Sequence, residues 1–292
     1  MKKQLQTPGT DSFFPSSGKK ESVPVLELSG PRLALAFQSL ALAAEDSGGV
    51  EQYVDAVKLK SAAFADALGG GRARDISLAE FRALCAYMST VRRRIGRHVE
   101  PEGYERLREG VVALLEGAQH TAMADARIEA FCARFPDDRE HRWVRDLAAE
   151  LLHHVDPERY PLMTRWVWDA RTNTGVIREI WHAEDVDHIR LEVPSTYETF
   201  VVLREELAQF LAGNGVYRDV LFFVDLLAAN VYAGYLHEQG GSYLRADFAN
   251  GPEPMMHIRR LLGLDGVGPD GRTRLKAADG TAVIIEDLPR LS

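Results

Sequence analysis

The sequence predicts a mainly α-helical protein: a helical bundle with a small β element near residues 176–193 and a β-hairpin at the C-terminus. Apolar residues recur at helical spacing through most of residues 31–155, the pattern of helices with one buried face. Ser77 and Glu80 have the spacing of a capping box, which begins a helix. Short connections marked by glycine or proline separate these segments, and such connections favour antiparallel neighbours in a bundle.

The same patterns divide the chain into four parts. Residues 1–28 are rich in Ser, Pro, Gly and Lys without periodicity, which predicts a flexible leader. An N-terminal helical bundle is expected over residues 29–155. Residues 156–264 are a mixed region with a central buried helix, packed on the bundle as one unit. Residues 265–292 form the C-terminal hairpin.

Six helices are expected in the first half of the chain. Pro31 is suited to the first turn of the first helix, and Gly69 to Gly71 end the second. Asp137 and Glu140 repeat the capping-box spacing before the last helix. The expected helices cover residues 31–45, 50–68, 77–98, about 102–117, about 119–134 and 137–155.

The second half is less regular. One helix is expected around 161–170, and residues 175–181 are either a strand or a short helix. Polar and apolar residues alternate over 188–193, which is the period of a half-buried strand. Further helices are expected over 196–211, where Ser195 and Glu198 give a third capping-box spacing, over 216–241, which is apolar on nearly every side, and over 253–263; Asp279 and Gly280 form the hairpin turn.

Composition and charge narrow the class of protein. The chain has 292 residues, 46% hydrophobic and 27% charged, which is typical of a soluble globular protein. Its net charge of −8 disfavours binding to nucleic acid or to anionic lipid, so neither partner is expected. The basic run Arg92 to Arg94 is interpreted as a solvated helix end. Cys85 and Cys132 lie in apolar helical patterns, which favours reduced thiols and a cytoplasmic location.

Aromatic and arginine residues are concentrated in one region. All four tryptophans lie between residues 141 and 188, along with Arg165, Arg171 and Arg178. Such side chains are enriched at binding surfaces, although tryptophans also fill cores where an irregular segment crosses helices. Both interpretations stay open. The predicted binding residues are Trp166, Trp168, Arg165, Arg171, Arg178 and Trp181.

The stretch WHAEDVDHIR, residues 181–190, offers ligands for a metal such as zinc or iron. The candidate ligands are His182, Glu184, Asp185 and His188, with His153 or His154 from another turn. Their spacing matches no metalloprotease motif, and the two pairs at helical spacing point to different faces. The alternative is a charged connection, with His153 and His154 as residues of a helix's last turn that favour its negative end. No other cofactor is expected.

These observations favour one function class over another. No nucleophile elbow, P-loop or dinucleotide-binding motif is present. The sequence therefore predicts a cytoplasmic helical accessory protein that recognises a protein partner through its Trp-, Arg- and His-rich surface. The alternative is a metal-dependent hydrolase or oxygenase that uses the cluster at 182–188. The sequence does not set the oligomeric state.

Overall fold

The computed structural model describes residues 24–183, 188–243, 254–267 and 272–283, and these ranges are mainly helical, as predicted. The helices are α1 Gly30–Glu45, α2 Glu51–Leu68, α3 Leu78–Ala86, α4 Pro101–Leu115, α5 Ala124–Cys132, α6 Trp143–Val155, α7 Val176–Glu179, α8 Tyr197–Gly213, α9 Val220–Tyr243 and α10 Pro254–Leu261.

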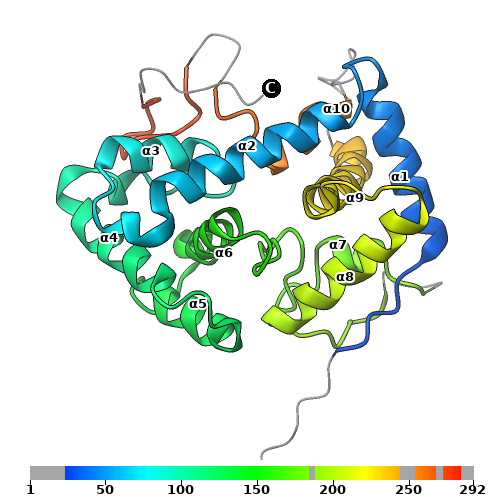
Figure 1. The fold of residues 1–292 in the computed structure, drawn as a ribbon, viewed down its shortest axis with the longest axis horizontal. Helices are drawn as coiled ribbons and strands as arrows, with labels where there is room; N and C mark the ends of the chain where they lie inside the picture. The colour runs from blue at the N-terminus through cyan, green and yellow to red at the C-terminus, as the bar shows by residue number, and fades with distance from the viewer. Residues whose placement is uncertain (1–23, 184–187, 244–253, 268–271, 284–292) are drawn as a thin grey trace, which may run out of the picture.

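The helices are arranged around α6 and α9. Figure 1 shows both of them nearly end-on beneath α2, which crosses them. Helices α4 and α5 pack beside α6, whereas α1, α7, α8 and α10 pack around α9. The interior therefore lies where α2, α6 and α9 meet, and α2 links the two groups.

Helix α9 contributes fully buried side chains, including Leu226, Leu227 and Ala229. Within the described residues it is the one helix long and apolar enough to cross a membrane by length and composition, over Val220–His237. Half of that window is buried inside the protein, and a core helix passes the same test. The buried half of α9 packs against α1, α2, α8 and α10.

The first predicted capping box is confirmed. The Ser77 hydroxyl accepts from the Glu80 backbone N–H at 3.2 Å, and the Glu80 carboxylate accepts from the Ser77 N–H at 2.9 Å. Gly70 and Gly71 end α2 with φ of 62° and 86°, a left-handed conformation that favours glycine.

The other two capping boxes were predicted wrongly, because neighbouring side chains take the capping role. Asp138, not Asp137, accepts from the N–H groups of residues 140 and 141, and it begins a short 3₁₀ turn before α6. At α8, the carboxylate of Asp125 on α5 accepts from the Tyr197 N–H at 3.0 Å. The hydroxyl of Ser195 is used elsewhere, since it accepts from the Ala170 N–H at 2.8 Å.

The helix predicted over 77–98 ends at Ala86, and turns follow it. Arg92 was interpreted as part of a solvated helix end, but its side chain is only 3% exposed and lies 2.8 Å from an Asp265 carboxylate oxygen. A Cβ on Gly96 would meet the Ala277 backbone at 2.6 Å. The segment 272–283 therefore packs closely on the turns after α3.

The small β element is not confirmed, because the described residues contain isolated bridges and no strand. Residues 176–179 are helix α7, and the helix expected around 161–170 is replaced by turns. Segment 188–193 follows the predicted alternation only in part, because Leu191 and Val193 are buried but Ile189, expected on the same face, is exposed. Side chains take the place of a partner strand: Asn173 accepts from the Leu191 N–H at 3.0 Å, and Arg178 donates to the Ile189 carbonyl at 3.2 Å.

The C-terminal hairpin is also not confirmed as a pair of strands. A single antiparallel bridge joins Lys276 and Ala282 around the turn at Asp279 and Gly280, where Gly280 has φ of 84°. Leu275 is fully buried against the helical body. The rest of the predicted hairpin, residues 284–292, lies outside the described ranges.

Candidate functional site

A cavity of about 570 Å³ lies between the end of α5, the start of α6 and the irregular segment around residues 165–171. Its volume is in the range of pockets that hold small molecules or short peptide segments. Its walls combine arginine, carboxylate, aromatic and thiol side chains. The lining residues used below are Glu129, Cys132, Phe135, Asp137, Asp138, Arg142, Arg145, Arg165, Trp168, Asp169 and Arg171.

Three of the predicted binding residues, Arg165, Trp168 and Arg171, line this cavity together. Two of them are rigidly held. Arg165 donates its backbone N–H, Nε–H and Nη2–H to the carboxylate of Asp146 on α6, with the shortest distance 2.7 Å. The indole N–H of fully buried Trp168 donates to the Val193 carbonyl at 3.0 Å.

The other three predicted residues, Trp166, Arg178 and Trp181, are not part of the cavity lining. Trp166 is 6% exposed and its ring packs 5.9 Å from that of Tyr232 on α9, so it belongs to the core. Arg178 holds the segment at residue 189 through its hydrogen bond to that carbonyl. Trp181 is half-buried, and its backbone forms an isolated bridge with Leu28.

Sequence reasoning missed Arg142 and Arg145, which complete the arginine wall. Arg145 donates to the Ser195 carbonyl at 2.8 Å, whereas Arg142 and Arg171 are exposed. In the part of the chain that the structure describes, none of these three guanidinium groups lies in a salt bridge with a carboxylate. Both arginines lie in the stretch DREHRWVRD, where they cluster with Trp143. The sequence analysis used this stretch only to predict a helix and so did not include them among the binding residues.

Carboxylates also line the cavity, and two of them are already engaged. Asp138 accepts from His141 Nδ1 at 2.8 Å as well as from backbone N–H groups, and Asp169 accepts from the Arg171 backbone N–H at 3.0 Å. Glu129 and Asp137 are exposed. The cavity is therefore of mixed charge, with exposed guanidinium groups beside carboxylates.

Cys132 and Phe135 form the apolar part of the wall, and both are half-buried. Burial raises the pKa of the Cys132 thiol, so the thiol stays protonated at neutral pH and acts as a small apolar side chain. The second cysteine, Cys85, is fully buried, and both thiols are free, as the sequence indicated.

A second concentration of charge lies inside the protein, between α2, α6 and α9. Lys60 on α2 is 1% exposed, and its ammonium group donates to Glu150 on α6 and to the Leu262 carbonyl, each at 2.9 Å. Burial lowers the pKa of Lys60 and raises that of Glu150, and each partner opposes the shift of the other.

The two adjacent histidines of α6 belong to this buried charged cluster. His153 Nε2 lies 2.9 Å from Asp225 of α9, and its Nδ1 lies 2.8 Å from the Tyr160 carbonyl. Burial lowers the pKa of His153, but these two partners outweigh burial and the pKa is raised. His154 Nδ1 lies 2.8 Å from the Ser61 hydroxyl, and burial, Lys60 and His153 together lower its pKa.

His153 and His154 lie in the last turn of α6, as interpreted, but they are also 2% exposed and hydrogen-bonded in the interior, which the sequence interpretation did not include. Glu150, His153 and His154 share one face of α6 at i, i+3 and i+4 spacing, and this spacing was the signal available in the sequence.

Ser61 and His154 have the distance of a nucleophile and its base, but the surroundings do not fit acyl transfer. Ser61 lies in the middle of α2, where the nearby backbone N–H groups are used in helical hydrogen bonds and cannot stabilise an oxyanion. His154 Nε2 is 3.7 Å from Glu150, whose oxygen is already bound to Lys60. The pair is a structural hydrogen bond.

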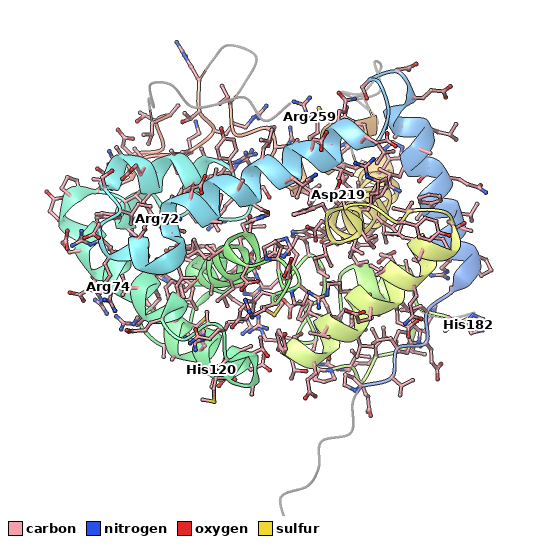
Figure 2. All side chains as sticks on the ribbon, viewed as in Figure 1. Arg72, Arg74, His120, His182, Asp219 and Arg259 are labelled. Carbon is pink, nitrogen blue, oxygen red and sulfur yellow. The ribbon has the colours of Figure 1, made fainter. Side chains whose placement is uncertain are left out.

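The predicted metal ligands do not come together in the described part of the chain. His182 is exposed and points away from the body beside the segment before α1 (Figure 2), whereas His153 and His154 are internal. Among the described residues no group of three His, Cys, Asp or Glu side chains is placed to hold a metal ion. Glu184 and Asp185 lie outside those residues, so the set at 182–188 stays a prediction.

Comparisons with known proteins provide no relative from which a function could be transferred. No family model matches the chain, and neither a curated protein nor a solved structure matches it significantly.

Proposed function

We propose that this protein is an interaction protein that binds an acidic segment of a partner protein in the arginine-lined cavity. The observation that carries the proposal is that Arg142 and Arg171 line one cavity, are exposed, and form no salt bridge within the described residues. Arginine and aromatic side chains provide most of the binding energy at protein interfaces.

The chemistry of the arginines selects the occupant. A guanidinium group donates two parallel hydrogen bonds to a carboxylate, which a lysine cannot do. Arg142 lies just before α6 and Arg171 follows the buried Trp168, so a bound carboxylate can receive donors from two different segments. Phe135 and Cys132 supply a surface for an apolar side chain beside that carboxylate.

The exposed carboxylates of Glu129 and Asp137 limit the charge of the occupant. A run of acidic residues would be repelled by them at short range. The segment that fits has one or two carboxylates next to an aromatic or aliphatic side chain. We also infer a cytoplasmic accessory role, which the two free cysteines support because disulfides are rare in reducing compartments.

A selection from a displayed library of random peptides tests this proposal. Peptides enriched on the natural chain should carry Asp or Glu beside an apolar residue. The affinity of the best peptide should fall by about 30-fold for Arg142→Gln and for Arg171→Gln, since losing a hot-spot side chain costs about 2 kcal/mol.

The matched control is Arg218→Gln, because Arg218 is exposed and lies outside the cavity. Its peptide affinity should stay within twofold of that of the natural chain. The proposal is wrong if no acidic peptide is enriched, or if the enriched peptides bind Arg171→Gln and Arg218→Gln equally well.

A further inference from the structure

A third concentration of charge lies where the turns after α3, the end of α10 and segment 272–276 meet. Three arginines from these three segments surround a single carboxylate, that of Asp265. Arg92 lies 2.8 Å from one oxygen of Asp265, while Arg274 and Arg260 lie 3.2 and 3.9 Å from the other. We refer to Arg92, Arg260, Arg274 and Asp265 as the arginine triad site.

The triad site contains buried donors that form no hydrogen bond with the described residues. The Nε atoms of Arg92, Arg260 and Arg274 are all buried and form no hydrogen bond, although those of Arg274 and Arg260 lie 3.2 and 3.9 Å from an Asp265 oxygen. Arg92 is the strongest case, since its side chain is 3% exposed. A buried N–H without an acceptor is costly, and such a group calls for an explanation, of which a bound ion is one.

The charges of the triad site do not balance either. Three guanidinium groups against one carboxylate leave two positive charges, and no second carboxylate of the described residues lies in a salt bridge with them. The chain as a whole is acidic, with a net charge of −8, so this surplus is local. Positive charges held close together without compensation repel one another, most strongly where the site is partly buried.

We propose that the triad site binds the phosphate group of a small soluble molecule. A phosphate dianion carries the two negative charges that the site lacks. Its tetrahedral oxygens accept hydrogen bonds from guanidinium groups that approach from different directions, as those of three chain segments do. Arg260 and Arg274 are 43% and 36% exposed, so the site is open to solvent on their side, while Arg92 forms its base.

Calorimetric titration of the full chain with inorganic phosphate and with pyrophosphate tests this inference. Both should bind with one-to-one stoichiometry, whereas acetate at equal ionic strength should not, because it carries one negative charge. Phosphate affinity should fall at least tenfold in Arg274→Gln, and Arg274→Lys should recover part of it, since the charge returns without the fork of donors.

Two controls keep this test separate from that of the cavity. Arg218→Gln removes the same charge from an exposed position elsewhere and should leave phosphate affinity within twofold. Arg142→Gln should also leave it unchanged, although the proposed function predicts that this change lowers peptide affinity about 30-fold. Circular dichroism melts in chloride should show that Arg274→Gln is folded, because Arg274 is partly exposed.

The inference is overturned if neither phosphate nor pyrophosphate binds, or if Arg274→Gln and Arg218→Gln bind them equally. It is also overturned if sodium chloride at the same ionic strength raises the melting temperature as much as phosphate does. Binding to phosphatidic acid vesicles that free phosphate does not compete would contradict a small soluble ligand.

Discussion

The arginine-lined cavity and the buried charged cluster differ in how their charges are partnered. In the buried charged cluster, Lys60 has Glu150 at 2.9 Å and His153 has Asp225 at 2.9 Å, and all four side chains are at most 5% exposed. In the cavity, Arg142 and Arg171 are exposed and form no salt bridge within the described residues.

This difference separates a structural role from a binding role. A charge taken out of water is tolerated only when a partner compensates it. The buried pairs therefore form as the protein folds, and they link α2, α6 and α9. An exposed guanidinium group is solvated and needs no partner, and it stays available to a ligand. Substitutions in the two regions should therefore affect different measurements.

The largest effect on stability is expected for Glu150→Leu. This change leaves the ammonium group of Lys60 buried without its counter-charge, and breaking one side of a buried pair costs about 3–5 kcal/mol. Denaturant unfolding should show the loss. The double substitution Lys60→Met with Glu150→Leu should recover much of it, because apolar side chains then replace the whole pair. A single variant as stable as the natural chain would contradict a structural role for this cluster.

For Trp168→Ala we expect a somewhat smaller loss in the free energy of unfolding, about 3 kcal/mol. This residue belongs both to the cavity wall and to the buried core. Trp168 lines the cavity but is fully buried and hydrogen-bonded to the Val193 carbonyl, so its removal leaves a void in the core. Unfolding in guanidinium measures the cost. If Trp168→Ala weakens peptide binding with unchanged stability, the indole belongs to the binding surface alone.

A pH-dependent effect of up to about 1.4 kcal/mol per pH unit is expected from His154. Its pKa in the folded chain lies well below the ordinary value, so the unfolded chain takes up a proton first as the pH falls. Stability from His154 is therefore present above the ordinary histidine pKa and is lost as the pH falls toward the lowered one.

The contribution of His154 can be isolated by comparing His154→Gln with His120→Gln, since His120 is exposed near α5 (Figure 2). The loss of unfolding free energy between pH 7 and pH 5 should be smaller in His154→Gln than in the natural chain and unchanged in His120→Gln. His153 acts in the opposite direction, because its pKa is raised in the folded chain. Equal acid sensitivity in both variants would contradict the assignment.

The smallest stability effect is expected for Arg171→Gln, within about 0.5 kcal/mol, because its guanidinium group is exposed and forms no salt bridge with a carboxylate of the described residues. Thermal melts should be nearly identical to those of the natural chain. A loss above 1 kcal/mol would show that Arg171 supports the fold, and the contrast between the two regions would weaken.

The sequence predicted what depends on local patterns. Most helices were found because their apolar spacing is regular, and the Ser77 capping box was found because its two partners lie three residues apart. The prediction of a strand over 188–193 was wrong. Alternating side chains indicate that one face is buried, but they do not show which groups form hydrogen bonds with the backbone. Here Asn173 and Arg178 satisfy the backbone from outside the segment.

The candidate sites depend on contacts across the sequence, and these were only partly predictable. Arg165, Trp168 and Arg171 were found because they cluster locally. Helical spacing alone could not show that His154 meets Ser61, which lies 93 positions earlier. Likewise, nothing near Arg92 in the sequence indicates that Asp265 compensates it.

The most direct test of the central claim, that the cavity holds the partner segment, is the alkylation rate of Cys132. Its thiol lines the cavity, while the only other thiol, Cys85, is fully buried and serves as an internal reference. Iodoacetamide modification followed by mass spectrometry, with and without a saturating acidic peptide from the selection, measures the rate. The peptide should slow the modification of Cys132 at least tenfold in the natural chain, and the same peptide concentration should give little protection in Arg171→Gln. An unchanged rate at Cys132 while the peptide is bound would show that the segment binds elsewhere.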